Sequence, residues 1–116
     1  MIKMKTAVIY ARVSSTGERQ STSRQVADLT DYANRNGLEV VGVYEEYISG
    51  AIRNEERAVL TECIDYAVTN GVEVVLFSEL SRCGRAVWEV LDTIRTLKDN
   101  DINAYFQKEG LSLFGT

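Results

Sequence analysis

The stretch Ala7-Val8-Ile9-Tyr10-Ala11-Arg12-Val13-Ser14 begins as a strongly apolar segment and ends in an arginine and a serine. Apolar, β-branched and aromatic side chains favour a buried strand over its first half, from Ala7 to Tyr10. The guanidinium and hydroxyl groups then stand at the carboxyl end of that strand. In open parallel sheets this is the end where ligands bind, so the stretch predicts a site for chemistry.

A second polar cluster, Ser81-Arg82-Cys83-Gly84-Arg85, follows another apolar run, Val74 to Phe77. In one parallel sheet the two strands would bring a hydroxyl and several guanidinium groups around a common anion. Planar guanidinium forks match the equatorial oxygens of a phosphoryl group in its transition state. The two clusters together predict a phosphate site.

The rest of the chain alternates between helical and strand patterns. Helical periodicity predicts helices over residues 22 to 36, 59 to 70 and 86 to 99, where Thr22-Ser23 can cap the first helix and Asn36-Gly37 and Asn70-Gly71 are stop signals. Apolar and β-branched runs predict strands over residues 7 to 10, 38 to 47, 72 to 77, 102 to 106 and 111 to 114, the last two at the sheet edge. A polar loop is expected from Ser49-Gly50 to Glu56.

This βαβαβαββ order predicts an α/β fold in three layers. Helices flank a mostly parallel sheet of four to five strands, the last of them antiparallel. The 116 residues suffice for one domain with its own core. A helix that begins near Arg85 would also direct backbone N–H groups towards a phosphate beyond the strand ends.

Composition excludes several kinds of chemistry. The chain has no histidine, which removes imidazole triads and imidazole metal ligands. Neither a Walker A loop nor a G-x-G-x-x-G turn occurs, so ATP and dinucleotides have no support. Glu45 and Glu46 should point to opposite strand faces, and Glu55-Glu56 suit a helix start. We therefore expect no metal and no cofactor.

Charge and apolar patterning limit the partners and the compartment. The net charge of -4 does not favour non-specific binding to a polyanion, so any contact with DNA must come from local arginines or from a basic segment outside this chain. No apolar run approaches the roughly 18 residues of a membrane span, and the first five residues lead straight into a strand. We expect a cytoplasmic protein in which Cys63 and Cys83 are free thiols.

Five separated motifs, in order, resemble the serine recombinase family of resolvases and DNA invertases. The resemblance spans essentially the whole chain, and the fold it implies agrees with the alternation of elements. It implies that residues 1 to 116 are the catalytic domain, and that the long oligomerisation helix and DNA-binding region of family members are absent from this chain. The motifs are Tyr10-Ala11-Arg12-Val13-Ser14, Gln25, Ser49-Gly50, Arg57 and Leu80-Ser81-Arg82-Cys83-Gly84-Arg85.

The resemblance implies a role for the serine and for three arginines. Ser14 would be the nucleophile, which forms a phosphoserine bond to the 5′ end of cut DNA and releases a 3′ hydroxyl, with Ser15 only a neighbour. Arg12, Arg82 and Arg85 would bind and polarise the scissile phosphate. Because the covalent bond keeps the energy of the phosphodiester, religation would need no ATP.

Further positions would support this site. The resemblance assigns Arg57 and Gln25 to polar positions around the phosphate, and places Tyr10, Glu46 and Ser81 among the supporting residues. Glu46 could equally be an exposed strand carboxylate, and Ser81 stands where many family members have aspartate. The general base that takes the proton of Ser14 is not identified.

Two functions of different classes follow. The first is a site-specific DNA recombinase that acts on double-stranded DNA as a homodimer and tetramer, with the isolated chain expected to be inactive or nearly so. The alternative is a non-catalytic α/β module that binds phosphate or DNA or serves in oligomerisation. A phospho-acceptor receiver domain does not fit, because the first strand leads to Arg12 and not to paired carboxylates.

Overall fold

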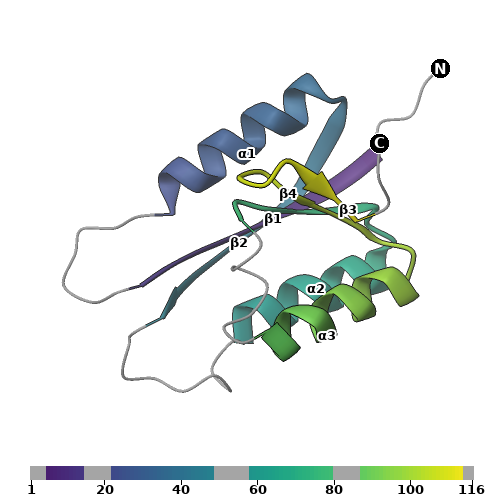
Figure 1. Ribbon diagram of the computed structural model, residues 1–116. Helices are drawn as coiled ribbons and strands as arrows, with labels where there is room; N and C mark the ends of the chain where they lie inside the picture. Colours follow the sequence, from purple (N-terminus) through teal and green to yellow (C-terminus); the bar gives the residue numbers. More distant parts are fainter. Residues whose placement is uncertain (1–4, 15–21, 49–57, 80–86, 114–116) are drawn as a thin grey trace.

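A computed structural model of the chain describes residues 5–14, 22–48, 58–79 and 87–113 (Figure 1). Five strands and three helices follow one another in the expected βαβαβαββ order. Helix and strand bounds agree with the sequence patterns to within a few residues at each end. The strands are β1 (Lys5–Ser14), β2 (Leu38–Ile48), β3 (Val74–Phe77), β4 (Asn103–Phe106) and β5 (Leu111–Ser112), and the helices are α1 (Ser23–Arg35), α2 (Ala58–Asn70) and α3 (Val87–Asp99).

The strands form one sheet in the order β2-β1-β3-β4-β5. The pairs β1–β2, β1–β3 and β3–β4 are parallel, and β4–β5 is antiparallel. Helix α1 covers one face, while α2 and α3 lie side by side on the other (Figure 1). The predicted three-layer α/β fold is confirmed. The prediction that β4 is an edge strand is wrong, because β5 pairs along its outer side.

Two apolar clusters, one on each face of the sheet, make up the core. Ala7 and Ile9 of β1 face α1, where they pack with Leu29 and Ala33. The alternate residues Val8 and Tyr10 face α2 and α3. All four residues of β3 are buried, as its continuous apolar run predicts for a strand covered on both faces.

The helices end where the sequence predicts. Gly37 and Gly71 adopt positive φ angles of 69° and 65°, a conformation that glycine reaches without steric cost, and they follow the ends of α1 and α2. None of the helices in the described part of the chain is long and apolar enough to cross a membrane.

The start of α1 differs from the prediction. The Thr22 carbonyl accepts the first helical hydrogen bond, from the Val26 N–H, but the Thr22 side chain makes no capping bond. Instead its hydroxyl donates to the Glu45 carboxylate on β2. The predicted side-chain cap by Thr22 is therefore wrong, because the Thr22 hydroxyl binds a carboxylate on β2 instead of the helix backbone.

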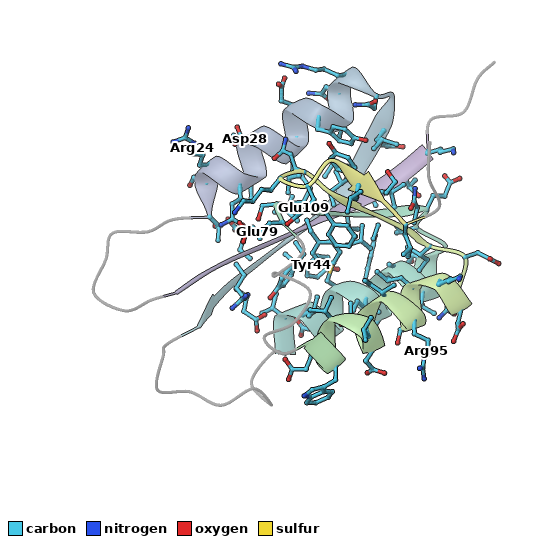
Figure 2. The ribbon with its side chains drawn as sticks, in the orientation of Figure 1. Arg24, Asp28, Tyr44, Glu79, Arg95 and Glu109 are labelled. Atoms are coloured by element: carbon cyan, nitrogen blue, oxygen red, sulfur yellow. The ribbon has the colours of Figure 1, made fainter. Side chains whose placement is uncertain are left out.

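A β-bulge at Val41 sets the orientation of the second half of β2. Ala7 is in register with Val40, but Val8 is in register with Gly42, so Val41 is an extra residue. Each one-residue offset turns the following side chains to the other face of a sheet. Val40 consequently packs on the α1 side and Tyr44 on the α2 and α3 side, as Figure 2 shows for Tyr44.

The buried thiol of Cys63 provides a test of this core. Burial raises the pKa of Cys63 from its ordinary value of 9.0 to about 12. This rise lowers the thiolate fraction about a thousandfold, and the thiolate is the reactive form. In a Cys83→Ser variant, we expect iodoacetamide at pH 8 to label the folded chain at least about a thousandfold more slowly than the urea-unfolded chain. Fast labelling of the folded chain would contradict the packing of α2 on the sheet.

Candidate active site

The carboxyl ends of the four parallel strands lie at the same end of the sheet, where β1 and β2 extend beyond β3. The register of β1 with β3 ends at the pair Tyr10–Phe77, whereas its register with β2 continues to Ser14–Ile48. Arg12 and the backbone of Ser14 therefore lie on a part of β1 that projects past the end of β3. The predicted location of these two residues, at a strand's carboxyl end, is confirmed.

Several predicted site residues lie outside the described part of the chain. They are Arg57, Ser81, Arg82 and Arg85, together with the side chain of Ser14. The described residues of the candidate site are Tyr10, Arg12, Gln25 and Glu46. All four come together around the carboxyl-terminal half of β1.

Arg12 is the arginine of this site in the described ranges. Its side chain is half-buried with a buried Nε atom, and its register partner on β2 is Glu46. Arg24 and Arg95 point away from the sheet on the outer sides of α1 and α3 (Figure 2). Arg35 forms a 2.7 Å ion pair with Asp31 on the exposed side of α1. Arg12 therefore differs from the other described arginines in both burial and location.

Gln25, in the first turns of α1, binds the backbone of Arg12 at two points. Its Oε1 atom accepts from the Arg12 N–H at 3.1 Å, and its Nε2 donates to the Arg12 carbonyl at 3.0 Å. The Ser78 hydroxyl, just past the end of β3, donates to the same Oε1 at 3.2 Å. The carboxamide thus connects α1 with the ends of β1 and β3.

Glu46 binds β1 on the face of the sheet that α2 covers. It is 4% exposed, and its Oε1 atom accepts a hydrogen bond from the hydroxyl of the fully buried Tyr10. Its Oε2 atom accepts from the Val59 N–H, in the first turn of α2, at 3.3 Å. Of the two possibilities for Glu46, the exposed strand carboxylate is wrong: this carboxylate is buried and joins β1, β2 and α2.

Sequence reasoning missed Ser78 and the bond between Thr22 and Glu45. Ser78 follows an apolar strand directly and precedes the arginine cluster, a place comparable to that of Arg12 after β1. This position could have marked Ser78 as a candidate. Nothing in the sequence indicates that the Thr22 hydroxyl pairs with Glu45, because the two residues are brought together only by the packing of α1 against β2.

A separate pocket of about 360 Å³ lies between α2 and α3. Leu60, Ile64 and Trp88 line it together with the carboxylates of Asp65, Glu89 and Asp92. Carboxylates repel a phosphate, so this pocket does not suit the anion that the arginines predict. Within the described ranges, no group of three or more His, Cys, Asp or Glu residues could hold a metal ion.

Comparison with known proteins identifies the class. A family model for the N-terminal domain of resolvases matches residues 7–114, and the chain belongs to this family. The N-terminal catalytic domain of TP901-1 integrase is similar, with a TM-score of 0.81 and 28% identity over 97% of this chain and 84% of that one. A resolvase family site-specific recombinase from Streptococcus pneumoniae is also similar, with a TM-score of 0.78 and 26% identity over 93% of this chain and 75% of that one.

A third similar structure is the C-terminal catalytic domain of ISC1926 TnpA, an IS607-like serine recombinase. Its TM-score is 0.74, with 30% identity over 88% of this chain and 67% of that one. The resemblance of the sequence to serine recombinases and the resolvase-like fold class are both confirmed by these similarities.

The bond between Tyr10 and Glu46 leads to a stability prediction. Tyr10→Phe removes the hydroxyl and leaves a buried carboxylate oxygen without that donor, which costs about 1–3 kcal/mol. We expect the free energy of unfolding, measured in urea, to fall by this amount with an unchanged m-value. Tyr66→Phe is the matched control on a half-buried tyrosine of α2. Equal stability of the two variants would mean that the Tyr10 hydroxyl contributes nothing.

Proposed function

We propose that this chain is the catalytic domain of a site-specific DNA recombinase whose nucleophile is Ser14. The observation that carries the proposal is the pair of hydrogen bonds between the Gln25 carboxamide and the Arg12 backbone at the carboxyl end of β1. These bonds fix the backbone of an arginine that stands two residues before a serine, in a chain of the resolvase family. Such fixed placement of a cation beside a nucleophile suits phosphoryl transfer, in which positioning and charge stabilisation supply most of the catalysis.

In the proposed reaction, Ser14 Oγ attacks the scissile phosphorus of double-stranded DNA. A bond forms between Oγ and phosphorus, and the bond from phosphorus to the 3′ oxygen breaks. The 3′ oxygen leaves as a hydroxyl and takes up a proton, while the Ser14 hydroxyl loses one. The 5′ phosphate remains on the protein as a phosphoserine ester. Attack by a 3′ hydroxyl of a new partner strand reverses these steps, so that no ATP is consumed.

Arginines supply the positive charge in this proposal. Arg12, Arg82 and Arg85 bind the non-bridging oxygens, on which charge lies in the transition state, and Arg57 lies among the supporting polar groups. Gln25 acts through the backbone of Arg12, since its carboxamide already binds that backbone and Ser78. No metal ion or organic cofactor takes part.

The proposed enzyme acts as a homodimer and tetramer on two DNA duplexes. Residues 1 to 116 form the catalytic domain, and further segments of the protein would supply the oligomerisation helix and the DNA-binding surface. The net charge of -4 supports this division, because contacts with DNA backbone that determine affinity are carried by basic residues. The isolated chain is accordingly expected to cleave DNA little or not at all.

The nucleophile is tested with the chain joined to a sequence-specific DNA-binding domain that supplies affinity. Ser14→Ala should lower the yield of covalent protein–DNA adduct, trapped by denaturation and resolved on a gel, by at least roughly a thousandfold. The matched control Ser15→Ala should form adducts normally. Adducts from Ser14→Ala but not from Ser15→Ala would assign the wrong serine. Equal behaviour of both variants would favour the non-catalytic binding module.

The arginines are tested by replacements that separate charge from geometry. Arg12→Ala should lower the rate of adduct formation about 10²- to 10³-fold, the usual loss for one donor to a transition-state oxygen. Arg12→Lys keeps the charge but loses the planar fork, so we expect only partial recovery. Arg24→Ala, on the outer side of α1, is the control and should react at the normal rate. Full activity of Arg12→Ala would remove Arg12 from the site.

A further inference from the structure

Beyond Tyr10, the edge of β1 that faces β3 binds a side chain instead of a strand. The register with β3 ends at the pair Tyr10–Phe77. Two residues further along β1, the backbone N–H and carbonyl of Arg12 bind the carboxamide of Gln25. Backbone N–H and C=O groups need such partners when they are buried. A side-chain amide thus takes the place that a peptide group of a longer β3 would occupy.

The chemistry of Arg12 fixes the orientation of this carboxamide. The Arg12 N–H is only a donor, so it must face the oxygen of Gln25, and the Arg12 carbonyl is only an acceptor, so it must face the nitrogen. The Oε1 atom then has one further lone pair. The Ser78 hydroxyl donates to it at 3.2 Å, so that both lone pairs of the oxygen are used.

Ser78 is itself held by the backbone on its other side. Its carbonyl accepts from the Lys108 N–H at 2.8 Å, and the preceding Phe77 carbonyl accepts from the Gln107 N–H at 3.0 Å. These bonds connect the end of β3 to the residues that follow β4. The Ser78 hydroxyl therefore stands at a fixed point, from which it can restrict the rotation of the Gln25 side chain.

We infer that Ser78 is a positioning residue whose hydroxyl locks the Gln25 carboxamide as a substitute strand partner for the end of β1. The lock fixes the backbone from Arg12 to Ser14 without contact between Ser78 and the reacting atoms. This inference rests on the proposed function for its consequence in catalysis, but its structural part concerns the free chain alone. It gives Ser78, which precedes the arginine cluster, a role distinct from phosphate binding.

The structural part is tested by NMR spectroscopy on the 116-residue chain without DNA. Ser78→Ala should shift the two side-chain amide proton signals of Gln25 and speed exchange of the Arg12 backbone amide hydrogen about 3- to 10-fold, the effect of losing one neutral hydrogen bond. Ser78→Thr keeps a hydroxyl and should restore both signatures. Ser112→Ala, a half-buried serine on β5, is the matched control and should change neither. Unchanged Gln25 signals in a folded Ser78→Ala chain would overturn the inference.

The catalytic part is tested in the fusion with a DNA-binding domain. At saturating DNA, Ser78→Ala should form adducts about 3- to 10-fold more slowly with an unchanged DNA dissociation constant, and Ser78→Thr should recover the rate. A weaker DNA affinity with a normal rate would instead mean that Ser78 binds DNA, and would overturn the positioning role. A normal rate of adduct formation by Ser78→Ala, together with shifted Gln25 signals, would also overturn the positioning role. Failure of the proposed function would appear separately, as adduct formation that does not depend on Ser14, while the NMR signatures still decide the role of Ser78.

Discussion

The buried carboxylate of Glu46 is the interaction on which the geometry of this site depends. A carboxylate removed from water is costly unless its oxygens find hydrogen-bond donors. Here one oxygen accepts from the Tyr10 hydroxyl on β1 and the other from the Val59 N–H of α2. N–H groups in the first turn of a helix have no partner within the helix, so this bond also favours the observed start of α2. A shift of any one of these elements would leave a buried polar group without its partner.

Gln25 makes the corresponding connection from the other face of the sheet. Its carboxamide approaches from α1, whereas Glu46 lies on the side of α2, and both act on the same few residues of β1. A single hydrogen bond contributes little, but two polar connections on opposite faces restrict both the displacement and the rotation of a projecting strand end. Preorganisation of this kind is what phosphoryl transfer requires, because a misplaced nucleophile or charge reduces the rate strongly.

The sequence predicted the layers of the fold because local patterns and tertiary burial agree there. The continuous apolar run of β3 could be stable only where both faces are covered, and the glycines at positions 37 and 71 allow the backbone conformation that ends α1 and α2. Arg12 was predicted at the site from its place at the end of a strand, whereas Tyr10 and Gln25 were predicted there only from the resemblance to serine recombinases. Where a polar side chain had a distant competing partner, local rules failed, as for the Thr22 hydroxyl that binds Glu45. The role of Ser78 depends on where β3 ends relative to β1, which no local pattern reports.

The extra residue at Val41 also determines which of the two adjacent glutamates in β2 faces which layer of the fold. Glu45 extends to the α1 side and meets Thr22, while Glu46 turns into the opposite layer. The face of the sheet that each glutamate occupies depends on the number of residues between the bulge and the pair, and not on any difference in their chemistry. This strand therefore tolerates exchange of side chains on its outer edge far more readily than a change in its length. Removal of one residue between the bulge and the pair would bring Tyr47 to the position of Glu46, and the layer that contains Tyr10 would lose its carboxylate.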